Sequence, residues 1–218
     1  MIALVDYGAG NLASVRKALA ALGAGYWTPT SAGELARARA IVVPGVGHFN
    51  ATAALDATWR QAILAALDRA APLLGICVGL QWLFEGSTEA PEVPGLGVIA
   101  GQCVSLSSGQ TAGGDGPPAA VESRLPTRLK IPHVGWNSLS FPRPSRLFEG
   151  IPGGTQVYFT HSYAAPIVRA TTAITTHGIP FSAAVEDGLV AGVQFHPEKS
   201  GDAGLRILGN WMSHVPTA

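Results

Sequence analysis

Two short segments carry the residue types that nucleophilic catalysis needs. Residues 75–79 read Gly-Ile-Cys-Val-Gly, and residues 195–198, far downstream, read Phe-His-Pro-Glu. A cysteine attacks as its thiolate, so it needs a neighbour that takes its proton, and a histidine oriented by a carboxylate can do this. The two segments together predict a cysteine nucleophile, Cys77, assisted by a pair formed by His196 and Glu198.

The residues around Cys77 predict how the thiol is presented. The apolar run 72–76 is typical of a short buried strand, and residues 78–84 have helical spacing. Cys77 is therefore expected on a tight turn between strand and helix, like the nucleophile of Gly-x-Ser-x-Gly hydrolases. The dipole and free N–H groups of a helix N-terminus favour a thiolate. Because alternate residues of a strand end point the same way, Glu198 is expected beside the imidazole of His196.

Each signal has a simpler interpretation when taken alone. A single cysteine in an apolar run is more often a small buried hydrophobe, and a single His-x-Glu is usually a surface pair. The combination of a glycine-flanked cysteine with a His-Pro-Glu segment favours catalysis.

Composition limits the class of protein. The chain has 218 residues, 47% of them hydrophobic, with 14 basic and 14 acidic side chains. This predicts one domain over 1–218 with a large core, and it gives no basic stripe for a nucleic acid. Two cysteines make no disulfide framework and fit a reducing cytosol. The N-terminus resembles a first strand rather than a signal peptide, and no apolar run is long enough for a membrane helix, so we expect a soluble, cytoplasmic protein.

The order of predicted elements indicates an α/β fold. Strands are predicted at 2–6, 26–27, 40–43 and 72–76, alternating with helices, one with Asn11 at its N-cap and one opened by a capping box at 31–34. Repeated strand–helix units imply a doubly wound, mostly parallel sheet flanked by helices. The second half is rich in strands, predicted at 97–106, 133–140, 156–163, 170–176, 181–186 and 190–195, before a last helix at 203–214. Residues 107–128, rich in Gly, Pro and Ser, are predicted to form a flexible surface loop.

The glycine-rich turn at 44–47 is expected beside Cys77, because ligands of such sheets bind at the carboxyl ends of the strands. A flexible backbone there can aim the N–H of Val46, together with the N–H of Val78, at a developing oxyanion. The alternative is an ordinary tight turn.

Residues 8–13 give the main competing hypothesis. They match the loose dinucleotide fingerprint G-x-G-x-x-G/A after a strand, which would make the chain a nucleotide-binding module. The acidic residue expected about 20 positions later is missing, because residues 26–33 contain no Asp or Glu. The match alone is weak evidence.

Six segments, in order along most of the chain, carry a family resemblance. They are residues 6–12, 44–49, 75–81, 132–137, 159–163 and 192–200. Together they resemble the glutamine amidotransferase subunits of imidazole glycerol phosphate synthases, within the class I glutamine amidotransferase family. Val78 and Leu80 stand where the family pattern has Leu and Met, and the 107–128 loop is longer than usual.

The resemblance implies a glutaminase that passes ammonia to a separate cyclase subunit, a (β/α)8 barrel, in a heterodimer. L-glutamine would form a thioester on Cys77, and the complex would make imidazole glycerol phosphate and aminoimidazole carboxamide ribotide. No cofactor and no metal are implied. A glutaminase that serves another synthase is the alternative within the class.

The resemblance also implies roles for further residues. The substrate would be held by Gly47, Gln81, Glu89 and the backbone of Ser162 and Tyr163. The partner side would carry Asn11, His133, Trp136 and Lys199. For Glu89 the alternative is an exposed acid at a helix end. Packing is the default expectation for the aromatic residues of segments 130–137 and 158–163, whose His spacing is poor for a metal.

Overall fold

The structure is a computed structural model that describes residues 1–107 and 130–215. Its helices are α1 (Leu12–Ala21), α2 (Ala57–Asp68), α3 (Val78–Leu83) and α4 (Gly201–Met212), with 3₁₀ segments η1 (Ala32–Arg37), η2 (Phe49–Ala54) and η4 (Pro197–Lys199). Its strands are β1 (Ile2–Leu4), β2 (Tyr26–Trp27), β3 (Ala40–Gly45), β4 (Leu73–Cys77), β5 (Gly86–Ser87), β6 (Gln102–Ser105), β7 (His133–Ser138), β8 (Gln156–His161), β9 (Tyr163–Ala164), β10 (Thr171–His177), β11 (Ile179–Asp187) and β12 (Val190–Val193).

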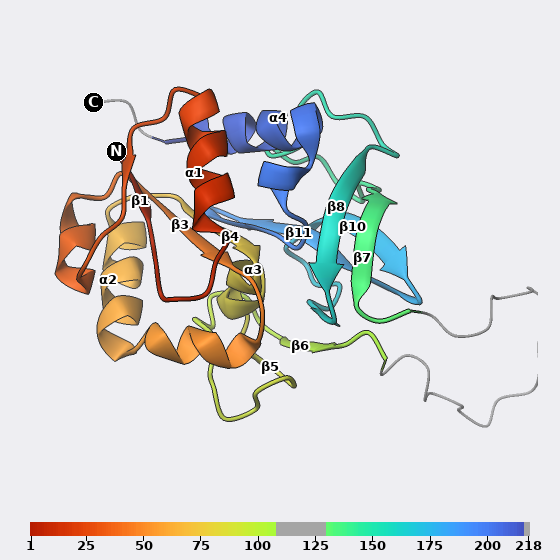
Figure 1. The fold of residues 1–218 in the computed structure, drawn as a ribbon, viewed down its shortest axis with the longest axis horizontal. Coiled ribbons are helices and arrows are strands. Elements are labelled where there is room, and N and C mark those ends of the chain that lie inside the picture. The colour runs from red at the N-terminus through yellow and green to blue at the C-terminus, as the bar shows by residue number, and fades with distance from the viewer. Residues whose placement is uncertain (108–129, 216–218) are drawn as a thin grey trace, which may run out of the picture.

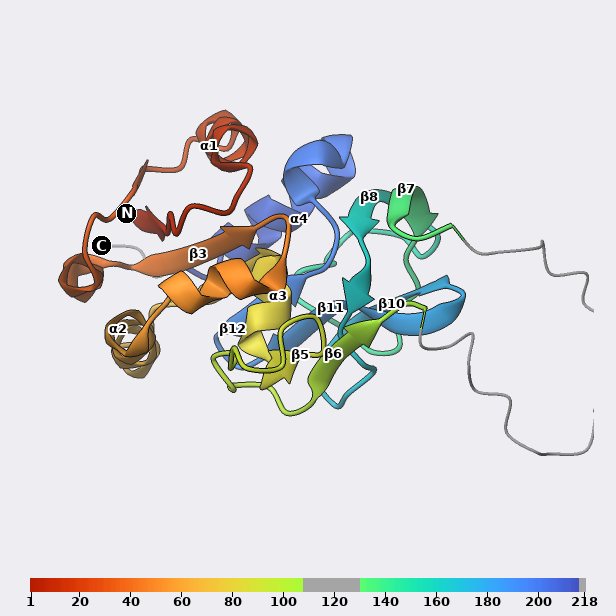
Figure 2. The ribbon, with the colours of Figure 1, turned by 60° about the horizontal axis from the view of Figure 1, so that its bottom comes forward.

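A seven-stranded sheet forms the centre, with the strand order β10-β11-β12-β4-β3-β1-β2. The strands from β12 to β2 run parallel, while β11 and β10 are antiparallel additions at one edge. In Figure 2, α1 and α4 lie on one side of this sheet and α2 and α3 lie on the other. This confirms the predicted doubly wound, mostly parallel α/β fold.

The strand-rich second half adds two small sheets. One pairs β7 with β8, and the other joins β5, β6 and β9. Figure 1 shows β7 and β8 beside the far end of the central sheet, away from α2. The bridge between Ser140 and Ile174 connects the segment after β7 to β10. The Tyr158 carbonyl of β8 accepts from the backbone N–H of His196, which follows β12, so β8 lies close to the edge of the sheet where β12 ends.

The core follows from uninterrupted apolar strands. Every residue of β3 and β4 is buried, as expected for parallel strands covered by helices on both faces. The largest fully buried side chains are aromatic: Trp82, Phe49, Phe84, Phe159, Phe181 and Phe195. Their burial stabilises the fold by about 1.5–3 kcal/mol each. None of the described helices is both long and apolar enough to cross a membrane.

Two predicted elements differ from the structure. The strand predicted at 97–106 is confined to β6, because Gly97 and Gly101 have positive φ and turn the chain before it. The capping box at 31–34 opens a 3₁₀ segment instead of an α-helix, and Glu34 accepts from the N–H and hydroxyl of Thr30. Apart from residue 107, the predicted 107–128 loop lies outside the described residues.

Candidate active site

Cys77 lies on a strained turn between β4 and α3. It ends β4, and α3 begins at the next residue. Its φ of 54° and ψ of −108° are unfavourable for a residue with a side chain, at a cost of about 1–3 kcal/mol. Gly79 permits the turn, because a Cβ there would collide with the carbonyl of Val43 in β3. The predicted elbow is thus present.

His196 reaches the same edge of the sheet from β12. This strand pairs with β4 in parallel, with Val193 opposite Ile76. His196 follows β12 by three residues, and its backbone N–H donates to the Tyr158 carbonyl of β8 at 2.9 Å. Two segments more than a hundred residues apart in sequence therefore leave the sheet together.

Glu198 orients the imidazole of His196. The Nδ1 of His196 lies 2.8 Å from Oε1 of Glu198, and both side chains are 1% exposed. Strand alternation, which we expected to align the two residues, is not the cause. The chain enters the 3₁₀ segment η4 at Pro197, and this tight turn returns the carboxylate to the ring.

The electrostatics of His196 depend on its two acidic neighbours. Burial alone would lower the pKa of His196, but interaction with Cys77 and with Glu198 raises this pKa to about 10. The imidazole is therefore positively charged at neutral pH. A protonated imidazole is the form that can supply a proton to a leaving group.

Gln194 is a contact of Cys77 that sequence analysis missed. Its Nε2 donates to Sγ of Cys77 at 3.6 Å, while Sγ donates to the Thr160 carbonyl at 3.9 Å. Gln194 was included in a predicted strand and in the 192–200 segment of the family resemblance, but no role was assigned to it. Its position two residues before His196 was the available signal, because alternate residues of an extended chain face the same side.

A cavity of about 200 Å³ opens over Cys77. All five residues predicted to hold the substrate line it: Gly47, Gln81, Glu89, Ser162 and Tyr163. Val78 and three further residues, Pro132, Thr160 and His161, complete the lining. The predicted nucleophile and the predicted substrate residues therefore share one cavity.

Some polar atoms of the residues that line this cavity have hydrogen-bond partners within the protein, and others have none among the described residues. Gln81 donates through Nε2 to the Tyr163 carbonyl at 2.8 Å, while its buried Oε1 has no hydrogen-bond partner in the described residues. Glu89 accepts the Phe49 N–H through one carboxylate oxygen at 2.8 Å. Glu89 is thus half-buried at the cavity wall rather than an exposed helix-end acid.

The two residues whose N–H groups were predicted to stabilise an oxyanion, Val46 and Val78, differ in their position relative to the cavity. Val78 lines the cavity, and Val46 directly follows β3, whose last residue Gly45 pairs with Cys77. Val46 is not among the lining residues, but the next residue, Gly47, is, with a φ of 87°. Glycine is required there because side chains disfavour this conformation.

Three of the predicted partner residues are accessible. Trp136 is 57% exposed and packs edge-on against Tyr158. The Lys199 ammonium lies 5.8 Å from the centre of the same Tyr158 ring. Asn11 is half-buried directly before α1, which also packs against η4.

His133 does not fit the prediction that it faces a partner. Its residue is only 4% exposed, and the ring stacks between Phe159 and His177. His133 is held there by His161. The Nδ1 of His161 faces the Tyr163 carbonyl at 2.8 Å and must carry the proton, so the Nε2 of His161 accepts from Nδ1 of His133 at 3.0 Å.

These two rings are uncharged at neutral pH. Burial, with a smaller effect of neighbouring imidazoles, lowers the pKa of His161 to about 3 and that of His133 to about 4. The hydrogen bond to the Tyr163 carbonyl raises the pKa of His161 but does not offset burial. The pair thus supports the Tyr163 backbone at the cavity wall.

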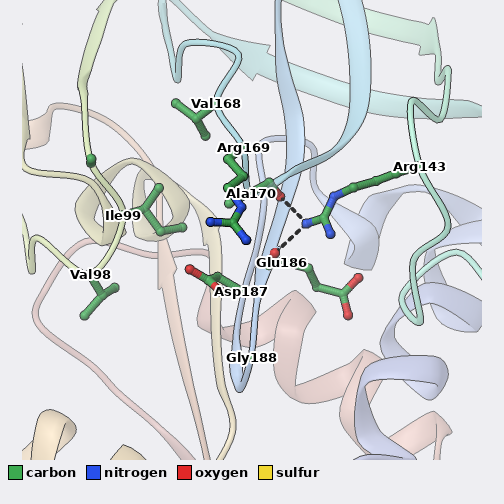
Figure 3. Close-up of a pocket in the computed structure, with 10 residues that line it drawn as sticks. Val98, Ile99, Arg143, Val168, Arg169, Ala170, Glu186, Asp187 and Gly188 are labelled. Carbon is green, nitrogen blue, oxygen red and sulfur yellow. Dashed lines mark hydrogen bonds between the residues drawn. The ribbon is translucent and has the colours of Figure 1, made fainter.

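A second cavity, of about 420 Å³, lies at the other end of the sheet (Figure 3). Asp187 and Gly188, which line it, precede β12 at its amino end, opposite Cys77. Arg143 donates there to the backbone carbonyls of Ala170, Thr171 and Glu186. This guanidinium therefore links β10 to β11, and its hydrogen bonds serve the fold rather than a ligand.

The 8–13 segment does not favour nucleotide binding. The Gly8 N–H, which a phosphate would need, donates to the Asp6 carboxylate at 3.0 Å. A carboxylate at this turn would also repel a phosphate. Within residues 1–107 and 130–215, no group of three or more His, Cys, Asp or Glu side chains is arranged to hold a metal ion.

Comparison with known proteins agrees with this geometry. The family model described as glutamine amidotransferase class-I matches residues 3–215. Curated relatives named imidazole glycerol phosphate synthase subunit HisH include one from Moorella thermoacetica, 42% identical with 96% of this chain and 93% of the relative covered. Another, from Shouchella clausii, is 43% identical with 95% of each covered.

Solved structures support the fold. One, titled a glutamine amidotransferase, matches with a TM-score of 0.70 at 18% identity over 98% of each chain. The structure of PurLQS from Thermotoga maritima matches with a TM-score of 0.69 at 17% identity, covering 99% of this chain and 98% of that one. The near-complete family match and the relatives above 40% identity show that this chain belongs to the class I glutamine amidotransferases and, among them, to the HisH family.

Proposed function

We propose that this chain is the glutaminase subunit of an imidazole glycerol phosphate synthase and uses a Cys77–His196–Glu198 triad. The observation that carries the proposal is the meeting of these three side chains at the carboxyl edge of the sheet, beneath a cavity of about 200 Å³. Only the histidine-pathway relatives, and not the geometry, point to this particular synthase.

The reaction begins with attack of the Cys77 thiolate on the carboxamide carbon of L-glutamine. The carbonyl oxygen becomes an oxyanion, which the N–H groups of Val46 and Val78 stabilise. The C–N bond then breaks, and the positively charged His196 gives its proton to the departing nitrogen, releasing ammonia. A γ-glutamyl thioester remains on Cys77.

Hydrolysis of the thioester completes the cycle. A water molecule attacks the thioester carbon while the now neutral His196 accepts its proton, and the C–S bond breaks to release glutamate and the thiolate. Glu198 steadies the imidazolium in both halves of the cycle, since its carboxylate lies 2.8 Å from Nδ1. The raised pKa of His196, about 10, supports this assignment of a proton donor.

The substrate fits the polar groups of the cavity. The Glu89 carboxylate at the cavity wall suits the α-ammonium of glutamine. Gly47 and the backbone of Ser162 and Tyr163 complete the wall.

Ammonia then passes to a cyclase partner. We place this partner on the surface that Trp136 exposes, with Lys199 and Asn11 beside it. Two free, buried cysteines suit a reducing compartment, the cytoplasm.

The test is the steady-state glutaminase rate of the free subunit, of its complex with the cyclase, and of that complex with cyclase ligand. We expect the free subunit to be slower by about 10²–10³-fold, because the glycines flanking Val46 let its N–H turn away until the partner binds. Equal rates in all three states would contradict this gating. Absence of ammonia release from glutamine in every state would contradict the proposed function.

A further inference from the structure

The side chain of Gln194 contacts the nucleophile and has no role in the reaction as described above. Gln194 is fully buried, and its Nε2 lies 3.6 Å from Sγ of Cys77. Only the nitrogen of a glutamine amide can donate a hydrogen bond to the sulfur. The role of Gln194 therefore depends on which of its two side-chain amide atoms faces Cys77.

A backbone carbonyl fixes the orientation of this amide. Gln81 places one side-chain atom 2.8 Å from the Tyr163 carbonyl oxygen, which can only accept, so that atom is Nε2. The same Nε2 lies 3.2 Å from the Gln194 amide, which must present Oε1 to it. The Nε2 of Gln194 is therefore the atom that donates to Cys77.

The other neighbours of the sulfur do not replace this donor. The Thr160 carbonyl, 3.9 Å away, can accept from a thiol but repels a thiolate. Two titratable groups also face the sulfur: His196, backed by Glu198, and the phenol of Tyr7. Both the Nε2 of His196 and the hydroxyl of Tyr7 lack hydrogen-bond partners in the described residues.

We propose that Gln194 is a further catalytic residue, whose amide N–H stabilises the Cys77 thiolate and holds the sulfur toward the cavity. The proposal deepens the glutaminase function and rests on it. A hydrogen bond to a charged group is stronger than one to a neutral group, so this bond favours ionisation of the thiol. Because Gln81 links Gln194 to the Tyr163 carbonyl, the same hydrogen bonds join the substrate wall to the nucleophile.

The experiment measures alkylation of Cys77 by iodoacetamide as a function of pH. Cys103, fully buried and the only other cysteine, is replaced by Ala in every protein so that Cys77 alone reports. We compare this parent with Gln194→Met, which keeps the volume but cannot donate. Thr172→Val is the matched control, because Thr172 is also fully buried but its hydroxyl has no partner.

We expect the alkylation midpoint of Gln194→Met to rise by about one pH unit or more, and kcat for glutamine to fall about 10-fold with a small change in KM. The control should retain the parent midpoint. If the Met variant does not fold, Gln194→Asn, whose amide is one methylene shorter and cannot span both partners, serves instead. An unchanged midpoint in a folded variant would overturn the proposal.

The two proposals fail in different ways. A midpoint that rises in Gln194→Met, in a protein that never hydrolyses glutamine with its partner, would support the hydrogen bond and overturn the glutaminase. If the protein hydrolyses glutamine but the alkylation midpoint of Cys77 is the same in the parent and in Gln194→Met, the glutaminase function would be supported and the role of Gln194 overturned.

Discussion

Two sets of buried histidines near the candidate cavity, His196 on the one hand and His161 with His133 on the other, have pKa values shifted in opposite directions. His196 is 1% exposed, and its pKa is raised to about 10. His161 is 7% exposed and His133 is 4% exposed, and their pKa values fall to about 3 and about 4. Similar burial thus accompanies a raised pKa in one group and lowered pKa values in the other.

The difference lies in what each ring faces. His196 has the carboxylate of Glu198 on one nitrogen and Cys77 near the other, so two potential anions offset the cost of burying a cation. His161 faces only the Tyr163 carbonyl and other imidazoles, which cannot balance a charge. A charged ring can supply a proton to a leaving group, whereas neutral rings with fixed tautomers hold backbone in place.

The largest expected effect comes from removing the anion that Cys77 provides. Cys77→Ser should lower glutamine-dependent synthesis by the complex about 10⁴-fold or more, while ammonia-dependent synthesis by the cyclase continues. The comparison also predicts a lower pKa for His196 in this variant, measured by NMR of its ring. Appreciable glutaminase activity in Cys77→Ser would show that Cys77 is not the nucleophile.

Removing the second anion should have a smaller effect. Glu198→Gln keeps the shape of the side chain but leaves His196 without a carboxylate, so its surroundings approach those of His161. We expect a rate loss of about 10²–10³-fold, less than for His196→Ala, because orientation and charge are lost but the acid–base group remains. Rates are compared at saturating cyclase, where a wild-type rate in Glu198→Gln would remove Glu198 from the triad.

Sequence analysis could predict the parts of the site that depend on local pattern. The apolar run before Cys77 and the glycines around it predicted the elbow, and strand–helix alternation predicted the parallel sheet. The pairing of β4 with β12, which brings His196 to Cys77, depends on long-range packing that no local pattern encodes.

The incorrect and missing predictions for individual residues also arise because packing between distant segments is not visible in a local pattern. His133 belongs to a motif with the exposed Trp136, but alternation along β7 turns their side chains to opposite faces, so His133 is buried and Trp136 is exposed. Glu198 was correctly placed beside His196 for an incorrect reason, because η4 and not a strand joins them. Gln194 was missed because its amide acquires a role only when Gln81, more than a hundred residues away, orients it.

The smallest expected effect is on the pH dependence of the free energy of unfolding, and it tests the neutral pair His161 and His133. The pKa of a histidine in the unfolded chain is near 6.5. Between about pH 6.5 and 4.5, His161 and His133 therefore become protonated in the unfolded state but stay neutral in the folded state. The free energy of unfolding should therefore fall on acidification, by about 2 kcal/mol for each of these histidines.

The variant that removes this contribution is His133→Gln with His161→Gln, measured by urea unfolding at several pH values against the wild type. Its free energy of unfolding should be lower at pH 7, since the hydrogen bonds to Tyr163 are altered, but should depend less on pH below 6.5. His196 does not obscure the slope, because with a folded pKa of about 10 its contribution is fully present below 6.5 and is lost only as the pH rises toward 10. An unchanged acid slope in the double variant would mean that these rings accept protons within the fold, and the contrast between the two groups of histidines would no longer hold.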